Sequence, residues 1–318
     1  MRYHVDGDLV PADEATVSVR DRGFRYGDAA FETVRVYGGD LFAWDAHAER
    51  LRRTCDRISL DPPPTDDLRD RAKTTLAAND LSDAYLRLSV TRGVDDGGLA
   101  PPTDPDRTVV VTVRDLPRGG VDGTTPWDGP STLQTVKTRR VPSAAIPADA
   151  KTHNYLNGVL ASIELRVSDA DEAILLDDEG HVTEGTTSNV FFVADKGLHT
   201  PNLDGPVLPG VTRSLVIDLA ESEGIPVHEG AYTPSDLRDA DEVFVTSTTR
   251  EIRPVGTVDG IDVAGGPVTP LLANLYDRYV EERCYAGESG DEAGGDGSDS
   301  PDASSPDDGD AESRSHDR

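Results

Sequence analysis

Residues 21–36 read DRGFRYGDAAFETVRV, and they pass from a charged segment into one with the composition of a strand. The charged half, residues 21–28, predicts a polar turn in which arginine and aspartate side chains pair. Residues 31–37 predict an extended strand, since aromatic and β-branched residues dominate them. The Gly-Gly-Asp sequence at 38–40 predicts the hairpin turn that ends this strand. This order predicts a sheet that begins early in the chain.

The rest of the chain alternates between strand and helix patterns. Period-two alternation predicts strands at residues 85–91 and 108–113. Turn signals and strand-like composition predict further strands at residues 3–5, 8–10, 132–137, 172–176, 181–183, 189–194 and 243–245. Apolar residues at helical spacing predict helices at residues 46–58, 68–78, 154–166, 210–223 and 267–282. The mixture, without an internal repeat, predicts an α+β or mixed α/β fold.

Two changes of composition predict the domain boundaries. Residues 119–129 are rich in Gly, Pro, Asp and Thr and lack periodicity, which is typical of a linker. We therefore predict a small N-terminal α/β domain at 1–118 and a larger C-terminal domain at 130–285. Residues 286–318 hold eleven acids, two arginines and no aromatic residue, so they cannot bury enough surface to offset the entropy of ordering. We predict a disordered acidic tail there.

The 318-residue chain is strongly acidic, because 60 Asp and Glu against 31 Lys and Arg give a formal net charge of −29. A surface of this sign opposes nucleic acid and anionic lipid as partners. No apolar stretch reaches the roughly 18 residues of a membrane span, and the first residues lack a signal-peptide core. We therefore expect a cytoplasmic protein. Two cysteines and seven dispersed histidines indicate neither a disulfide framework nor a metal site.

Lysine is rare, with four in the chain against 27 arginines. Acid-rich, lysine-poor surfaces suit a salty cytoplasm, because carboxylates hold water and salt screens their repulsion, and we predict a halophilic source. One of the four, Lys151, opens the sequence KTHNYL at the entrance of the predicted helix 154–166. A helix N-terminus and partial desolvation favour a neutral, nucleophilic amine, although an ordinary exposed lysine fits this position as well.

Three further segments place polar residues where a strand or helix begins or ends. TEGTTSNVF at 183–191 puts a glutamate and small hydroxyl residues between two strands. LPGVTR at 208–213 opens a helix with a glycine and free N–H groups, which can cradle a phosphate. VTSTTREIRPV at 245–255 ends a strand in hydroxyls. Each segment alone also fits a polar turn, an ordinary helix start or a polar strand end.

Together and in this order, the segments resemble the class IV aminotransferases, which are fold-type IV enzymes that use pyridoxal 5′-phosphate (PLP). The resemblance spans residues 3–283 and includes seven blocks: DRGFRYGDAAFETVRV at 21–36, HAERL at 47–51, LRLSVTRG at 86–93, KTHNYL at 151–156, VTEGTTSNVF at 182–191, LPGVTR at 208–213 and VTSTTREIRPV at 245–255. It implies a two-domain fold like that of the D-amino-acid aminotransferases, a homodimer, and a small amino-acid-like substrate.

The resemblance also implies roles for single residues. Lys151 would link covalently to the cofactor and move the α-proton, and Tyr155 would contact the cofactor O3′. Glu184 would hydrogen-bond the pyridine nitrogen and keep it protonated, so that the ring accepts electrons.

Two further groups complete the expected site. The phosphate would be bound by Arg50, the backbone N–H groups of Val211 and Thr212, and the hydroxyls of Thr248 and Thr249. The substrate would be contacted by Tyr26, Tyr85 and Arg87.

The blocks leave the reaction open. The spacing from Lys151 to Asn154 resembles D-amino-acid aminotransferases and aminodeoxychorismate lyases, whereas the NYLN sequence at 154–157 and the pair Tyr85 and Arg87 resemble branched-chain aminotransferases. Residues 93–100 lack the arginine and histidine with which D-amino-acid enzymes bind a carboxylate, and their glycines resemble the lyases.

The leading hypothesis from the sequence is therefore aminodeoxychorismate lyase, which forms 4-aminobenzoate and pyruvate for folate synthesis. The alternative is an L-amino-acid aminotransferase of the branched-chain type that uses 2-oxoglutarate. A non-catalytic interaction protein built on the same scaffold is the remote alternative.

Overall fold

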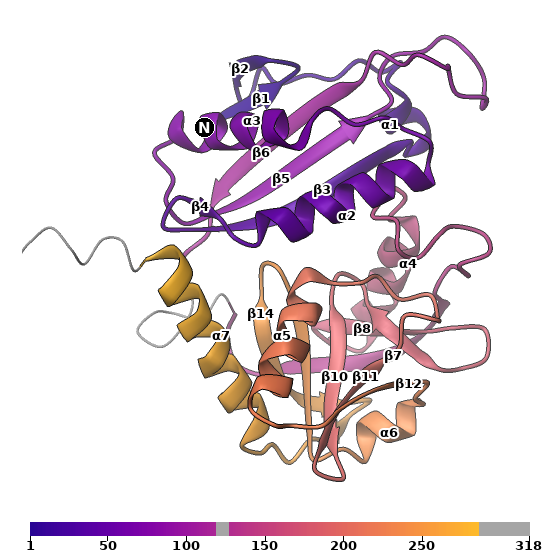
Figure 1. Cartoon of the computed structure of the whole chain (residues 1–318). Coiled ribbons are helices and arrows are strands. Elements are labelled where there is room, and N and C mark those ends of the chain that lie inside the picture. The colour runs from indigo at the N-terminus through magenta and orange to yellow at the C-terminus, as the bar shows by residue number, and fades with distance from the viewer. Residues whose placement is uncertain (119–126, 286–318) are drawn as a thin grey trace, which may run out of the picture. The chain divides into compact units, whose positions relative to one another are not determined.

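The computed structural model describes residues 1–118 and 127–285. Most of the predicted linker at 119–129 and the whole predicted tail at 286–318 lie outside the described residues. The described residues form one compact unit, which contains two separate sheets (Figure 1). Each sheet falls within one of the two predicted domains, and the domain division itself stays a prediction.

The first sheet has six antiparallel strands in the order β2-β1-β6-β5-β3-β4. Its strands are β1 (Arg2–Val5), β2 (Asp8–Pro11), β3 (Ala29–Tyr37), β4 (Asp40–Leu41), β5 (Ala84–Thr91) and β6 (Thr108–Asp115). The predicted hairpins turn at Asp6-Gly7 and Gly38-Gly39, where all four residues have positive φ, a region that glycine adopts without steric cost.

Helices α2 (Trp44–Arg57) and α3 (Thr65–Ala77) pack against this sheet (Figure 1). Alternate strand residues such as Val34 and Val36 join apolar side chains of both helices in one core. Because side chains alternate between the faces of a strand, the intervening residues of β3 and β5, such as Phe31 and Arg87, lie on the other face. That face carries the polar and aromatic residues that matter for the site.

The second sheet has nine strands, eight of them in the order β12-β11-β10-β13-β14-β7-β8-β9, with β15 paired to β14. They are β7 (Ser131–Arg139), β8 (Glu172–Leu176), β9 (Val182–Gly185), β10 (Asn189–Ala194), β11 (Gly197–Pro201), β12 (Val227–Gly230), β13 (Glu242–Ser247), β14 (Glu251–Val258) and β15 (Ile261–Asp262). On β10, Val190 and Phe192 enter one core while Phe191 and Val193 enter another. The sheet is therefore buried on both faces, which explains its near-continuous apolar runs.

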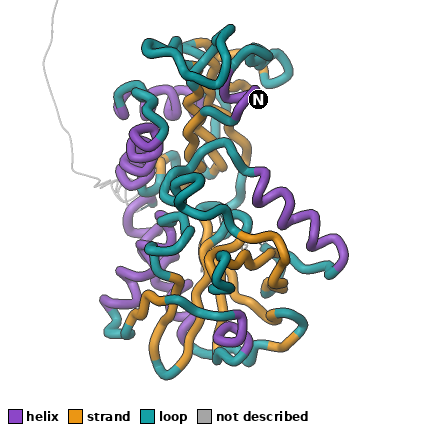
Figure 2. Tube along the Cα trace, turned by 90° about the vertical axis from the view of Figure 1, so that its right-hand side faces the viewer, coloured by secondary structure: helices purple, strands orange, loops and turns teal. Residues whose placement is uncertain are grey.

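Helices flank these strands (Figure 2). The remaining helices are α1 (Arg22–Tyr26), α4 (Leu156–Glu164), α5 (Val211–Ser222), α6 (Pro234–Arg238) and α7 (Val268–Cys284), with a 3₁₀ turn at Leu165–Val167. Helix α4 packs on β7 and β8, and α5 and α7 pack on β13 and on each other. None of the helices in the described residues is long and apolar enough to cross a membrane. In the same part of the chain, no cluster of three or more His, Cys, Asp or Glu is placed to hold a metal ion.

The predicted elements are largely confirmed, and the differences have local causes. The predicted turn at 21–28 is the short helix α1, because the Asp21 side chain caps it by accepting the Gly23 N–H. The predicted helix at 154–166 begins at Leu156, and its last turn is a 3₁₀ turn. Strand β14 is not predicted because Pro254 and Gly256 interrupt its pattern.

Candidate active site

Lys151 lies in an extended segment that pairs with the N-terminal end of β3. Its carbonyl accepts the Phe31 N–H at 3.0 Å, and its own N–H donates to Thr54 Oγ1 at 2.9 Å. The predicted helix begins at Leu156, five residues after Lys151, and the polarisation of this lysine by a helix N-terminus stays a prediction. The position of Lys151 is therefore set by β3 and α2.

The Lys151 amine points to an aromatic corner. Nζ donates to the Tyr155 hydroxyl at 3.0 Å and lies 4.6 Å from the centroid of the Phe31 ring. Within the described residues it makes no ion pair with a carboxylate. Phe31 and Tyr155 meet edge to face, with their centroids 5.3 Å apart. The amine is thus partly desolvated and free of a counter-ion, which suits a nucleophile.

Tyr155 and Glu184 line one pocket, whose other walls include Val141, Ile146 and Leu208. Glu184 is 8% exposed; its Oε1 accepts Arg140 Nε at 2.7 Å and its Oε2 accepts the Leu208 N–H at 2.9 Å. A carboxylate has about four acceptor positions, so Glu184 can accept a further N–H. The combination of apolar walls and one buried acid fits a flat heteroaromatic ring with a protonated nitrogen.

Arg50 is buried on α2 and is held by the neighbouring strand. Its Nε and Nη2 donate to the two oxygens of Glu32 at 2.8 and 2.6 Å, and Nη1 donates to the Pro209 carbonyl at 3.0 Å. Three of the five guanidinium donors are used, and two remain for a ligand. Burial by itself would raise the pKa of Glu32, but Arg50 and then His47 outweigh burial and lower that pKa to about 2. Glu32 therefore stays ionised and fixes the guanidinium plane.

Arg50 reaches the N-terminus of α5, although 159 residues separate it from Pro209 in the chain. Gly210 precedes Val211 and Thr212, whose N–H groups belong to the first turn and lack helical acceptors. A Cβ at Gly210 would lie 2.0 Å from Asn189 Oδ1, so this close approach requires glycine. The arginine and the helix N-terminus thus lie side by side, an arrangement that can bind an anion such as phosphate, and their role toward a phosphate stays a prediction.

Thr248 and Thr249 lie in the turn between β13 and β14. Thr246 pairs with Asn189 across the sheet, and the Asn189 amide donates to the Leu208 carbonyl at 3.0 Å. The turn therefore follows the strand end that contacts residues 208–210. Both hydroxyls lie at the same end of the sheet as the α5 N-terminus, and their role toward phosphate stays a prediction.

The predicted substrate residues divide into two groups. The Arg87 guanidinium lies 3.8 Å from the centroid of the Phe31 ring, which Lys151 also contacts. Tyr85 is two residues along the same strand face, beneath Arg114. The Tyr26 hydroxyl accepts Arg25 Nη2 at 2.7 Å, and no contact in the described residues joins it to Lys151. The structure therefore brings Arg87 to the site, leaves Tyr85 beside it, and leaves Tyr26 on α1.

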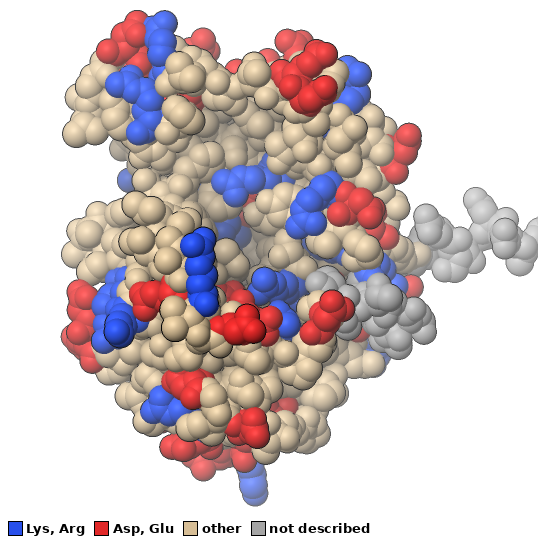
Figure 3. Space-filling model, turned by 180° about the vertical axis from the view of Figure 1, so that it is seen from behind, with Lys and Arg blue, Asp and Glu red and all other residues tan. Residues whose placement is uncertain are grey.

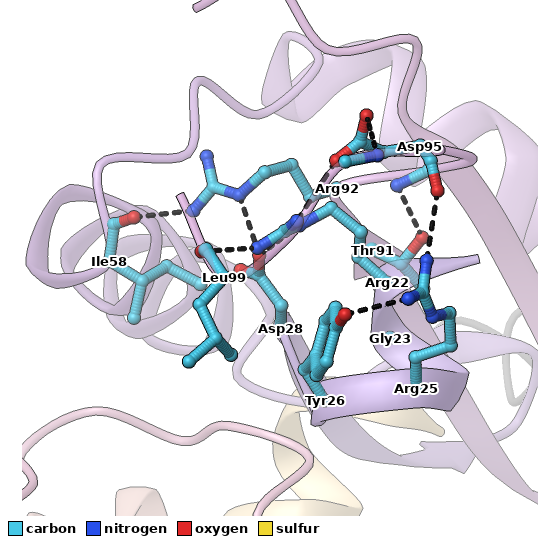
Figure 4. A network of polar contacts seen from close by, with 12 residues as sticks. Arg22, Gly23, Arg25, Tyr26, Asp28, Ile58, Thr91, Arg92, Asp95 and Leu99 are labelled. Atoms are coloured by element: carbon cyan, nitrogen blue, oxygen red, sulfur yellow. Dashed lines mark hydrogen bonds and ion pairs between the residues drawn. The ribbon is translucent and has the colours of Figure 1, made fainter. Parts of the chain in front are cut away.

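The charged segment at 21–28 organises the loop that follows β5 (Figure 4). Asp28 Oδ2 accepts Arg22 Nε at 2.8 Å and Arg92 Nε at 2.9 Å, and Arg22 also binds Asp95 at 3.0 Å. Arg22 further donates to the carbonyl of Leu99. The predicted arginine–aspartate pairs are confirmed, and they leave these arginines no free charge for a substrate.

Several residues of the site escape the sequence prediction. Arg140 directly follows a predicted strand and is one of several basic residues there, so it does not stand out. Phe31 and Glu32 lie inside a predicted strand, where the sequence does not distinguish a residue of the site from a residue of the core. The spacing of His47, Arg50 and Thr54 along α2 is a signal that could have been used, since such residues share a helix face. All three are buried on that face.

Figure 3 shows a hollow on the rear face of the molecule with Lys and Arg side chains on its walls.

Comparisons with known proteins agree with this geometry. The sequence profile of the family described as "Amino-transferase class IV" matches residues 29–258. A Methanocaldococcus jannaschii protein named "Putative branched-chain-amino-acid aminotransferase" is 39% identical over 285 residues, covering 89% of this chain and 96% of its own. A D-alanine aminotransferase of Listeria monocytogenes is 36% identical over 289 residues, with the same coverage.

Solved structures give the same result. The T.th. branched-chain amino acid aminotransferase with pyridoxamine 5′-phosphate has a TM-score of 0.82 at 30% identity and covers 89% of this chain and 94% of its own. The 4-amino-4-deoxychorismate lyase of Pseudomonas aeruginosa has a TM-score of 0.76 at 30% identity, covering 89% and 100%.

The fold and the site thus define a PLP-dependent enzyme of fold type IV. The chain belongs to the class IV aminotransferases. The residues present fit the cofactor, because the described part of the chain combines an amine without a counter-ion, a buried acid that lines a pocket, and an arginine with two further donors beside a helix N-terminus.

Proposed function

We propose that the protein is an amino-acid aminotransferase that acts on L-amino acids of the branched-chain type with 2-oxoglutarate as the acceptor. The observation that carries this proposal is the position of Arg87. This partly buried guanidinium lies over the Phe31 ring, 3.8 Å from its centroid, and Lys151 Nζ is 4.6 Å from the same centroid. Within the described residues Arg87 has no carboxylate partner, so a substrate carboxylate would supply its missing charge.

The chain's own residues have clear tasks in this reaction. Bound PLP supplies an electron sink for the charge that forms when a proton leaves the substrate α-carbon. Lys151 takes up and returns that proton, and its contact with the Tyr155 hydroxyl orients Nζ between transfers. Glu184 holds a proton on the ring nitrogen, with Arg140 and the Leu208 N–H fixing its carboxylate. Arg50 and the start of α5 hold the phosphate.

The loop after β5 supports an L-amino-acid substrate. A D-amino-acid enzyme of this family would place cations there, whereas this loop carries Asp95 and Asp96, which pair with Arg22 and Arg20. The arginines of the loop itself are paired with carboxylates as well, so within the described residues the loop offers no unpaired cation to a substrate carboxylate. The D-alanine aminotransferases among the relatives make D-alanine the necessary comparison substrate.

Aminodeoxychorismate lyase, the leading hypothesis from the sequence, is the second candidate. The observation that favours it is the likeness to the solved lyase, which aligns over its whole length. The curated relatives described above carry aminotransferase names instead. Both reactions use the same proton transfer by Lys151, so the site geometry alone does not separate them.

The test is a comparison of substrates with the purified holoenzyme. We expect glutamate formation from leucine plus 2-oxoglutarate, slower formation from D-alanine, and no 4-aminobenzoate from 4-amino-4-deoxychorismate. Release of 4-aminobenzoate without leucine turnover would replace the proposal with the lyase.

A pair of arginine variants tests the site itself. Arg87→Leu should lower kcat/KM for leucine about 10- to 100-fold, as expected for the loss of a charge-assisted hydrogen bond. Arg114→Leu is the matched control, since Arg114 is an exposed arginine on the same sheet and stacks on Tyr85. It should leave kcat/KM nearly unchanged. Equal losses in both variants would argue against a specific role for Arg87.

We also propose a homodimer in the cytoplasm. Helix α4 exposes four apolar side chains, Leu156, Val159, Leu160 and Ile163, at 68%, 51%, 47% and 45%, and contiguous apolar surface of this kind marks an interface. Sedimentation of the purified protein at micromolar concentration should give a dimer, and a monomer would refute the assignment.

The remote alternative of a non-catalytic protein predicts a chain that does not bind PLP.

A further inference from the structure

Glu251 combines an unusual backbone conformation with burial. It directly follows the turn at residues 248–250 and has φ of 56°, a left-handed conformation that costs a residue other than glycine free energy. Its side chain is nevertheless buried, with 7% of the residue exposed. Ser247 pairs with Glu251, so Glu251 is the first strand residue after a three-residue hairpin loop, and its left-handed backbone favours glycine.

The backbone conformation therefore does not explain why position 251 is a glutamate. The hydrogen bond of its carboxylate does. Glu251 Oε1 accepts the Tyr37 hydroxyl at 2.7 Å. Tyr37 is 1% exposed and ends strand β3, 214 residues earlier in the chain. The Arg35 guanidinium stacks over the Tyr37 ring at 4.7 Å and donates to the carbonyls of Leu116 and Pro117 at 2.6 Å. The bond thus ties the hairpin loop to a rigid strand of the first sheet.

The hairpin loop is also tied to the second sheet. Arg250 Nη1 lies 3.6 Å from Glu172 Oε2. Glu172 is buried, and its Oε1 accepts the Thr186 N–H and Thr186 Oγ1 at 2.8 and 2.6 Å. Thr186 lines the pocket that contains Glu184. Contacts to both sheets therefore fix the loop that carries Thr248 and Thr249.

We propose that Glu251 is a positioning residue for the phosphate end of the site: through Tyr37 it holds the turn at which Thr248 and Thr249 meet the cofactor phosphate. This inference rests on the phosphate role proposed above for the two threonines. It predicts that removing Tyr37, Glu251 or both has the same effect. It also predicts that this effect weakens the binding of the cofactor phosphate more than the binding of the pyridine ring.

The experiment compares the affinity of the apoenzyme for PLP and for pyridoxal, which lacks the phosphate, using cofactor fluorescence. Three variants are compared with the wild type: Tyr37→Phe, Glu251→Gly and the double variant. Glycine relieves the left-handed backbone while removing the carboxylate, so a loss of affinity cannot be attributed to strain. We expect PLP to bind about tenfold more weakly in each variant, pyridoxal to change less than about twofold, and the double variant to resemble the single ones. Glu251→Gln, which keeps an acceptor for Tyr37, should restore most of the affinity.

Glu242→Gln is the matched control. Glu242 is also a buried glutamate, and it lies at the opposite end of β13, where it accepts the N–H groups of Val268 and Thr269 at 2.8 and 2.6 Å. This variant should lower thermal stability and leave the ratio of PLP to pyridoxal affinity unchanged. Equal weakening of both ligands in Glu251→Gly and Tyr37→Phe, or loss of stability alone, would overturn the positioning role. A wild type that binds PLP no better than pyridoxal would instead overturn the phosphate site.

Discussion

Replacement of Glu32 by glutamine isolates the contribution of the buried Glu32–Arg50 pair to stability. The Glu32 side chain is 1% exposed, and both of its oxygens accept hydrogen bonds from Arg50. Burial acts to raise the pKa of Glu32, but Arg50 dominates together with His47, and the pKa falls from 4.5 to about 2. A fall of this size corresponds to about 3 kcal/mol of folding free energy at neutral pH.

The sign of this effect determines its pH dependence. Because folding lowers the pKa, the stabilisation is complete above pH 4.5 and disappears as the pH falls toward 2. Glu32→Gln cannot ionise, so the variant should be about 3 kcal/mol less stable than the wild type at pH 7 and about 2 kcal/mol less stable at pH 3.5. Urea unfolding at both pH values, in one salt concentration, measures the gap.

Glu49→Gln is the control on the same helix. Glu49 pairs with Arg52 at 2.8 Å, and both side chains are more than half exposed, so its removal should change stability little. A gap below about 1 kcal/mol for Glu32→Gln at pH 7 would refute the reasoning, since burying an unpaired guanidinium is costly. A gap that stays constant from pH 7 to pH 3.5 would refute it as well, because the wild-type carboxyl would then not be the titrating group.

Three further predictions use simple measurements. Lys151→Ala should abolish turnover and shift the near-visible absorbance of the PLP-bound protein to that of the free aldehyde, and a variant that retains both the turnover and the wild-type spectrum would exclude Lys151 as the covalent site. Glu184→Gln should lower kcat by roughly 10²- to 10⁴-fold while PLP still binds; an unchanged kcat would mean that the ring nitrogen has another partner. Dilution from molar to millimolar salt should lower the thermal midpoint, because unscreened carboxylates repel one another on a chain of formal charge −29. A midpoint independent of salt would contradict the halophilic hypothesis.

The fold is predictable wherever one pattern dominates a segment. Strand β10 follows its run of apolar residues, helix α7 follows the helical spacing of its apolar residues, and the hairpin at residues 6–7 follows its turn residues. Strand β14 escapes prediction because Pro254 interrupts a strand pattern, yet there the strand pairs with β13 on one side and β7 on the other. Tertiary pairing supplies what the local sequence lacks.

The candidate site shows the same limit more sharply. The Lys151–Tyr155 contact lies within one short segment, whereas Arg50 meets the Pro209 carbonyl across a separation of 159 residues. No spacing rule connects Arg50 with Pro209, so the sequence predicts their proximity only through the resemblance to the class IV aminotransferases. The backbone of Lys151 is held by hydrogen bonds to β3 and α2, and the local sequence does not predict these contacts because it shows only the helix that follows.

Strand β3 explains why such distant residues converge. Phe31 N–H holds the Lys151 carbonyl, Glu32 holds Arg50, and Tyr37 holds Glu251. Because neighbouring side chains point to opposite faces of a strand, the Phe31 ring contacts the Lys151 amine on one face of the sheet, while Glu32 binds Arg50 of helix α2 on the other. A shift of β3 by one residue would exchange these faces and break all three links at once. The block at residues 21–36 therefore does more than begin a sheet, since its strand sets the relative positions of the Lys151 amine, the Arg50 guanidinium and the hairpin loop.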